Sequence, residues 1–151
     1  GTLSALGRWC DQGDGTVKDM TNELVWLKDA GWGGTKAWRE VGDQYQCDDA
    51  HVRAGLLNAS TSGAGLSDGS VDGDWRLPTK TELVGITVGD EYIRSSQMYF
   101  FTGVQSDHYW ASGTHPYSTN NAWYVSMYNG TAVWDNKFIR YYYVWPVRGG
   151  N

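Results

Sequence analysis

The sequence predicts an α+β domain in which short helices pack on antiparallel sheets, and three observations support this class. The 151-residue chain contains 20 glycines and lacks long helical periods, so turns and short strands should dominate. Residues 123–128 alternate between two kinds of side chain, as an extended strand with two different faces does. Thr79 followed by Glu82 forms a capping box, which is typical of a helix beginning at Lys80.

Length, composition and charge narrow the class of protein. With 40% hydrophobic residues and nine tryptophans, residues 1–151 are expected to form a single domain with one core. The net charge of -5 argues against a nucleic-acid partner, because phosphate neutralisation needs a basic patch. No apolar run of transmembrane length occurs, so direct membrane insertion is not expected. Because the chain opens at Gly1, we expect a mature fragment, and a lost signal peptide or upstream segment stays open.

The N-terminal part is expected to form a β-hairpin over residues 8–31. The Asp14-Gly15 turn precedes a short strand over 16–19, and a second strand follows over 23–27. Three aspartates here, Asp11, Asp14 and Asp19, resemble part of a calcium loop, but the longer ligand ladder and distal glutamate of an EF-hand are missing. Turn formation is the favoured interpretation, and a metal site is the alternative.

From Thr35 the apolar spacing becomes helical. Thr35 is the expected N-cap of a helix containing Ala37, Trp38 and Val41, and a polar break is expected over residues 42–49. A second helical segment is expected around His51, from the apolar set Ala50, Val52, Ala54, Leu56 and Leu57. His51 has no cysteine or carboxylate at ligand spacing, so an exposed helix residue is favoured over a metal ligand.

Residues 58–73 form a Ser/Gly/Asp-rich surface loop, in which Asp68, Asp72 and Asp74 are more typical of turns than of an ion site.

The next segment, GDWRLPTKTELVGI, enters the core. Trp75 and Leu77 alternate with Arg76, and the capped helix should bury Leu83 and Ile86. Arg76 is expected to be a structural cation that pairs with a carboxylate or capping carbonyls, with anion binding as the alternative.

Two cysteines, Cys10 and Cys47, are too far apart for a redox motif and too few for a metal site. A disulfide and two buried thiols are equally compatible with this pattern.

The C-terminal stretch, residues 103–151, contains 12 of the 22 aromatic residues and almost no arrangement suited to acid–base catalysis. One face of its central strand is expected to be apolar and inward, formed by Trp123, Val125 and Met127. The other face would display Tyr124, Ser126 and Tyr128, and Asn129-Gly130 would then turn the chain into a hairpin. This pattern indicates a binding module.

Catalytic patterns are not found in the sequence. No phosphate loop, nucleophile elbow or metal-type histidine spacing occurs, so we expect no enzyme activity, no cofactor and no metal.

With these residues in view, the chain resembles a bacterial family, the C-terminal-domain family of the collagen-like adhesin Lcl. The resemblance runs through five blocks in order: CDQGDGTVKDMTNELVWLKDA, GDWRLPTKTEL, GVQSDHYWAS, NNAWYVSMYNGTAV and YYYVWPVRGG. It implies a C-type-lectin-like fold related to formylglycine-generating enzymes. That oxidase activity, which uses cysteines of the C-terminal half, should be absent, because no cysteine follows Cys47.

The same resemblance implies a variable protein of a diversity-generating retroelement, in which adenine-directed mutagenesis rewrites codons near the C-terminus. A fixed scaffold would contain Trp75, Arg76, Trp110, Trp123, Trp145 and Arg148, and also Val125, Gly130, Val133, Lys137 and residues 144–147. A ligand-binding face within a display region of about 103–148 would contain His108, His115, Tyr117, Tyr124, Ser126, Tyr128, Thr131, Ala132, Trp134, Asp135, Asn136, Phe138, Ile139, Arg140, Tyr141 and Tyr142. Trp134 departs from the pattern, because adenine changes in an Asn codon do not produce Trp.

We therefore expect noncovalent recognition of a macromolecule, a protein or a glycan, at this face. An extracellular or cell-surface location is expected, with a cytoplasmic one left open, and oligomers are compatible with the sequence. The alternative functions are a bacterial surface adhesin domain that binds host glycans such as glycosaminoglycans, and an enzyme derived from the related oxidase fold. The acidic composition weighs against a strongly sulfated ligand.

Overall fold

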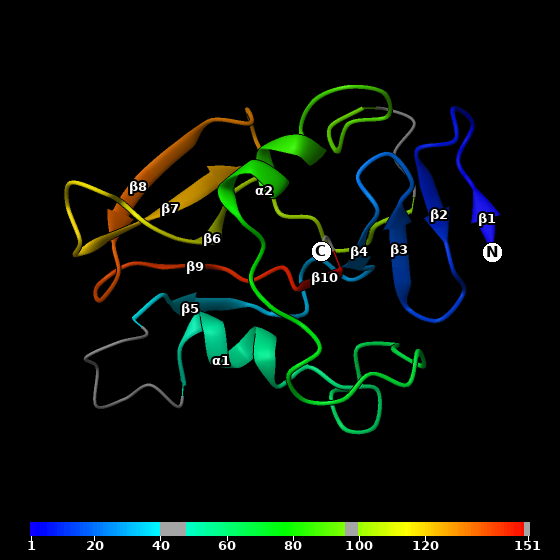
Figure 1. The fold of residues 1–151 in the computed structure, drawn as a ribbon, viewed down its shortest axis with the longest axis horizontal. Coiled ribbons are helices and arrows are strands. Elements are labelled where there is room, and N and C mark those ends of the chain that lie inside the picture. Colours follow the sequence, from blue (N-terminus) through cyan, green and yellow to red (C-terminus); the bar gives the residue numbers. More distant parts are fainter. Residues whose placement is uncertain (40–47, 96–99, 150–151) are drawn as a thin grey trace.

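The computed structural model describes residues 1–39, 48–95 and 100–149. Two five-stranded sheets and two short helices form its framework, which confirms the α+β class (Figure 1). The first sheet has the order β1-β2-β3-β4-β10, with strands Thr2–Leu3, Trp9–Asp11, Thr16–Asp19, Leu24–Leu27 and Val147–Gly149. The second has the order β5-β9-β6-β7-β8, with strands Thr35–Ala37, Tyr141–Tyr143, His108–Thr114, Asn121–Ser126 and Ala132–Asn136.

The N-terminal hairpin is confirmed, and the aspartates around it serve turns. Strands β3 and β4 pair antiparallel from Thr16↔Leu27 to Asp19↔Leu24. Asp14 Oδ1 accepts the Thr16 N–H at 3.0 Å, and Asp19 Oδ1 accepts the Thr21 N–H at 3.0 Å. The C-terminal strand β10 joins the same sheet beside β4, so the two ends of the chain share one sheet, although β1 and β10 lie at its opposite edges.

The prediction of a helix that begins after Thr35 is wrong. Residues Thr35–Ala37 form strand β5, which pairs antiparallel with β9. Pairing with a distant strand outweighs the local helical propensity of this segment. Trp38 is held separately, because its indole N–H donates to the Ala111 carbonyl at 2.8 Å. Val41 and most of the expected polar break lie outside the described residues.

The other two helix predictions are confirmed. Helix α1 spans Ala50–Gly55, and the Asp49 side chain caps it by accepting the Val52 N–H at 2.9 Å. Its histidine, His51, is half-buried with its ring edge-on to Trp38 at 4.4 Å, so the expected exposure is wrong. Helix α2 spans Lys80–Ile86 and has the full capping box, and Leu83 and Ile86 are buried.

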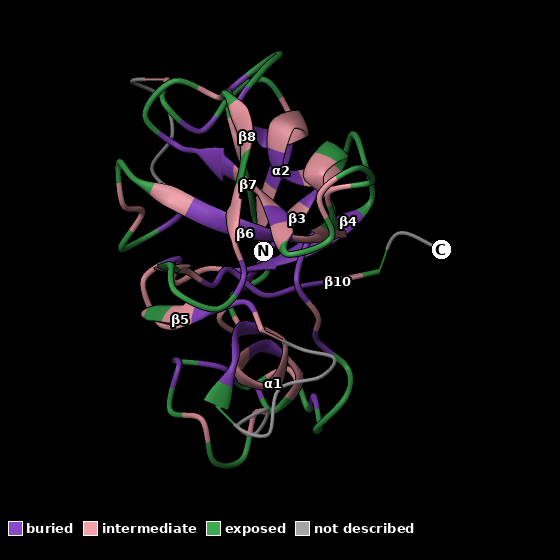
Figure 2. Cartoon of the chain, turned by 90° about the vertical axis from the view of Figure 1, so that its left-hand side faces the viewer, coloured by how far each residue is buried: buried purple, intermediate pink, exposed green. Residues whose placement is uncertain are grey.

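The core has two parts, which lie on opposite faces of the second sheet. The larger part includes Trp9, Trp26, Tyr109 and Trp145, between the first sheet, α2 and the second sheet. The smaller part includes Trp38, Ala50, Ala54, Leu77, Trp110, Ala122 and Val144, and it lies toward α1. Strand β4 and residues 109–111 of β6 are buried, whereas β8 and many loops are intermediate or exposed (Figure 2).

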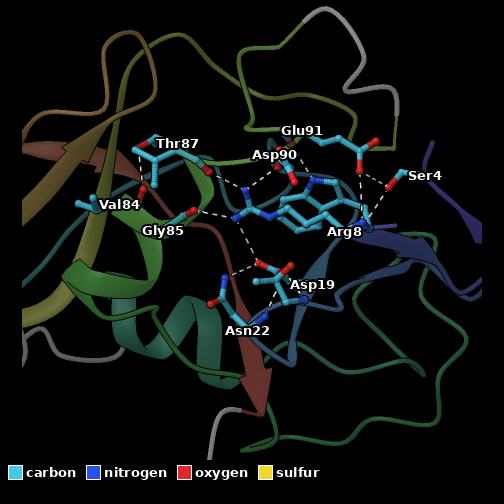
Figure 3. A network of polar contacts seen from close by, with 12 residues as sticks. Ser4, Arg8, Asp19, Asn22, Val84, Gly85, Thr87, Asp90 and Glu91 are labelled. Carbon is cyan, nitrogen blue, oxygen red and sulfur yellow. Dashed lines mark hydrogen bonds and ion pairs between the residues drawn. The ribbon is translucent and has the colours of Figure 1, made fainter. Parts of the chain in front are cut away.

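Arg8 ties the N-terminal strands to the end of α2 (Figure 3). Its Nη1 donates to the carbonyl oxygens of Val88 at 2.6 Å and Asp90 at 2.9 Å. Its Nη2 donates to the Gly85 carbonyl at 2.6 Å and to Asp19 Oδ2 at 3.3 Å. A buried guanidinium with four acceptors cross-links elements that hydrophobic burial alone would hold loosely.

Cys10 is a free, half-buried thiol, and Cys47 lies outside the described residues. No helix in the described part of the chain is long and apolar enough to cross a membrane.

Candidate functional site

The exposed part of the predicted face lies on the turns of the second sheet, on its edge strand β8 and at the start of β9. Tyr117 is 94% exposed on the β6–β7 loop, and Tyr128 is 72% exposed on the β7–β8 turn. The remaining exposed members lie on the β7–β8 turn, on β8, on the β8–β9 turn and at the start of β9: Thr131, Trp134, Phe138, Ile139, Arg140 and Tyr141. We call these eight residues the exposed set. Among the described residues, Tyr92 is the one exposed aromatic side chain outside it.

Three further predicted residues are half-buried and pack together on Trp110. The His108 ring stacks on Tyr124 at 4.3 Å, and the Tyr142 ring lies 4.8 Å from both Tyr124 and Trp110. Trp110 itself is fully buried, and its indole N–H donates to the Lys36 carbonyl at 2.7 Å. We call His108, Trp110, Tyr124 and Tyr142 the aromatic cluster. Its rings support one another, so the two tyrosines are less displayed than the alternating pattern predicts.

Asp135 links the aromatic cluster to the exposed set. The Tyr142 hydroxyl donates to Asp135 Oδ2 at 2.6 Å, and Arg140 Nε lies 3.5 Å from Asp135 Oδ1. Burial, and then the nearby Asp135 carboxylate, raise the pKa of Tyr142 and of Tyr124. Burial alone would raise the pKa of Asp135, but the hydrogen bond from Tyr142 and the other donors outweigh it and lower that pKa. Tyr142 is therefore a fixed hydroxyl donor at neutral pH.

His115 lies in a second aromatic group at the other face of the sheet. Its ring is 4.5 Å from Trp134 and 5.2 Å from Trp123. Trp123 is half-buried instead of fully inward, because it lies at the rim of the core, where Lys80 Nζ is 3.9 Å from its ring centroid. The inward prediction holds for Val125 and Met127, which are buried.

The predicted exposure of Ser126 is wrong. Its side chain is buried, and its backbone closes the β7–β8 turn by donating to the Thr131 carbonyl at 2.9 Å and accepting from the Gly130 N–H at 2.7 Å. The turn folds back over this residue, which simple alternation does not anticipate. The remaining predicted residues of β8, Ala132 and Asn136, are half-buried.

Most of the residues predicted to form the scaffold are buried or make polar contacts within the fold. Trp75, Trp110 and Trp145 are buried, and the Trp145 indole N–H donates to the Leu27 carbonyl at 2.9 Å. Arg76 makes a two-point contact with Glu82, from Nη1 to Oε1 at 2.8 Å and from Nη2 to Oε2 at 3.0 Å. The expected structural role of Arg76 is thereby confirmed. Arg148 Nη2 binds Asp68 Oδ2 at 3.0 Å, and its guanidinium lies 5.1 Å from the Trp75 ring centroid.

Two cations near this surface come from outside the predicted display region. Arg39 Nη2 donates to the Tyr141 hydroxyl at 2.8 Å. Lys36 lies opposite Tyr142 in the β5–β9 ladder, and its ammonium pairs with Asp48 Oδ1 at 2.6 Å. No local sequence signal identifies either residue, because their positions depend on the pairing of strands about one hundred residues apart.

The side chains of this surface are suited to noncovalent contact with another molecule. It combines exposed aromatic rings, hydroxyls and the paired Arg140, which is 57% exposed, with few titratable groups. Within the described ranges, no three or more His, Cys, Asp or Glu side chains lie together as metal ligands. A depression of about 650 Å³ lies beside Asp11, Lys28 and Asp29 and shares no residue with the exposed set.

The fold and the surface define a class of protein: a small two-sheet α+β domain that presents aromatic side chains from the turns, the edge strand β8 and the start of β9 in its second sheet. Residues 15–148 match the Lcl C-terminal domain family, so the chain belongs to that family. Neither the search of curated proteins nor the search of solved structures found a match.

Proposed function

We propose that this domain is a noncovalent ligand-binding module with a C-type-lectin-like fold, and that it carries no enzyme activity. The exposed set and the open edge of the aromatic cluster form the recognition surface. The partner is a macromolecule, most simply a protein. The domain acts outside the cell or at the cell surface.

One observation carries the proposal. Five of the six exposed aromatic side chains of the described residues fall between Tyr117 and Tyr141. These rings lie near both ends of β7, on the edge strand β8 and from the β8–β9 turn to the start of β9, and large exposed rings concentrated in one part of a domain favour contact with a partner. Tyrosine and arginine are also the residue types that contribute most at interfaces, because they offer large rigid contact areas and directed hydrogen bonds.

The second part of the proposal is that this surface is exchangeable, as in the variable protein of a diversity-generating retroelement. Two structural features support it. The exposed set makes few contacts that the fold needs, so its side chains can be replaced at small cost. The buried indoles of Trp110 and Trp145 each donate to a distant backbone carbonyl, which holds the strands in place whatever side chains the surface has.

A glycan ligand is the rival within the same surface. Arg39 and Arg140 lie near Tyr141 and would suit an anionic sugar, but Arg140 is paired with Asp135 and the chain is acidic as a whole. Binding to heparin that weakens steeply with added salt would favour this adhesin function.

Sequencing of the gene and its flanks tests the exchangeable surface. The proposal expects a near-copy of the 3′ end of the gene, with extra adenines, beside a reverse-transcriptase gene. Related copies should differ at the codons of the exposed set other than Trp134 and agree at Trp110, Val125 and Trp145. Differences spread evenly along the gene, or concentrated at the buried residues, would refute it.

A further inference from the structure

Strand β8 is an open edge of the second sheet. It pairs with β7 on one side, from Asn121↔Asn136 to Val125↔Ala132, and no described strand lies on its other side. Natural edges are protected by lysine, proline, bulges or a covering element. The sequence of β8, Ala-Val-Trp-Asp-Asn, has neither lysine nor proline, and its register with β7 is continuous. Its one charged residue, Asp135, is already held by Tyr142 and Arg140.

The register shows which backbone groups of β8 point outward. Ser126 N–H donates to Thr131 O at 2.9 Å, and Lys137 N–H donates to Asn120 O at 2.9 Å. Hydrogen-bonded pairs alternate along an antiparallel ladder, so Val133 and Asp135 direct their amides to β7. The N–H and C=O groups of Ala132 and Trp134 therefore point away from the sheet.

The far end of this edge is already closed. The Asn136 N–H donates to Asp135 Oδ1 at 2.8 Å, which leaves Ala132 and Trp134 as the part of β8 able to pair fully. Trp134 is 47% exposed at this edge. An incoming strand would thus bond two residues of β8 and cover an exposed indole.

We propose that β8 pairs antiparallel with the β8 strand of a second copy of this chain. The pairing places Ala132 of one copy opposite Trp134 of the other, with Val133 on the two-fold axis. All the open amides of Ala132 and Trp134 are then satisfied, and each bulky indole meets the small alanine of its neighbour. This self-matching is the property of an isologous interface, and it favours a second copy over an unrelated strand.

The pairing joins two five-stranded sheets into one. Because Val133 shares its face with Tyr124, its opposite neighbour in β7, the aromatic clusters of both copies point the same way. A dimer of this kind binds a repetitive target at two points, which raises its avidity. The pairing also accounts for the exposure of Trp134 and for a fixed Val133. The fixed Val133 and the gain in avidity rest on the proposed function, whereas the strand pairing does not.

Analytical ultracentrifugation of the 151-residue chain at increasing protein concentration tests the pairing. Wild-type protein should reach twice the 16.8 kDa mass of one chain. Val133→Lys and Val133→Glu should each weaken the dimer more than about tenfold, because like charges meet across the axis. An equimolar mixture of the two variants should restore a dimer that contains one copy of each.

Two further variants keep the outcome clear. Ala132→Pro removes an outward N–H, leaves the β7–β8 ladder intact, and should also give monomers. Val71→Lys, an exposed loop position, should leave the dimer unchanged. A wild-type chain that stays monomeric at millimolar concentration would overturn the proposal, as would a dimer that survives Val133→Lys or a mixture that stays monomeric. None of these outcomes depends on the presence of a ligand.

Discussion

Tyr142 and Tyr128 look alike in the sequence, yet the structure predicts opposite effects of replacing them. Tyr142 packs on Trp110, Tyr124 and His108 at 4.8, 4.8 and 4.9 Å and donates to Asp135, whereas the Tyr128 side chain is 72% exposed. Half-burial of a ring contributes about 1 kcal/mol. Its aromatic pairs and the charged hydrogen bond contribute about 2 kcal/mol more.

Tyr142→Ala should therefore lower the free energy of unfolding by about 3 kcal/mol, and Tyr142→Phe by about 1 kcal/mol, because only the hydroxyl is lost. Tyr128→Ala should change it by less than about 0.5 kcal/mol. Urea unfolding followed by tryptophan fluorescence measures each value from the shift in midpoint at constant slope. A Tyr142→Ala cost below about 1 kcal/mol, or a larger cost for Tyr128→Ala, would refute the division into packed and exposed tyrosines.

Three further predictions concern the scaffold. Arg8→Lys should lower the free energy of unfolding by about 2–3 kcal/mol, since an ammonium cannot satisfy the four acceptors of the guanidinium. Arg94→Lys, at an exposed position, should be nearly neutral. Thermal unfolding compares the two variants, and equal effects would contradict the structure. Burial would raise the pKa of Glu82, but Arg76 and the helix cap outweigh it, so the pKa in the folded state lies below that in the unfolded state. The stability that Glu82 contributes is therefore present at neutral pH and is lost as the pH falls below about 4. Glu82→Gln should then be less stable than wild type at pH 7 and equal to it in strong acid, and a pH-independent difference would disprove the linkage. Gly130→Ala should lower the free energy of unfolding by about 1–2 kcal/mol, because Gly130 has φ 76° and the new Cβ would lie 2.9 Å from Thr87 Oγ1. An unchanged urea midpoint would show that the turn tolerates a side chain.

The sequence predicts local structure well and nonlocal structure poorly. The Thr79–Glu82 capping box and the hairpin around residues 16–27 depend on neighbours in the chain, so the sequence predicts both correctly. The segment after Thr35 forms a strand because it meets β9, about one hundred residues away. The role of Arg8 has no local sequence signal for the same reason, since Gly85, Val88 and Asp90 lie far along the chain.

The candidate site shows the same division. Alternation separates the two faces of β7 but does not reveal what lies against each one. The Tyr124 face borders the smaller core beside α1, which leaves Tyr124 and Tyr142 half-buried. Ser126 is buried because the turn bonds back over its backbone. The positions on turns, such as Tyr117, Tyr128 and Ile139, are exposed as predicted, because nothing distant packs on them.

The central claim is that a fixed scaffold presents an interchangeable surface, and a displayed library tests it most directly. The codons of the seven residues of the exposed set other than Trp134 would be randomised together, with every other position unchanged, and the library selected against an unrelated folded protein. The account predicts binders that retain the unfolding midpoint of the parent to within about 1 kcal/mol of stability. Loss of folding in most members, or failure to enrich any binder while the domains stay folded, would contradict it.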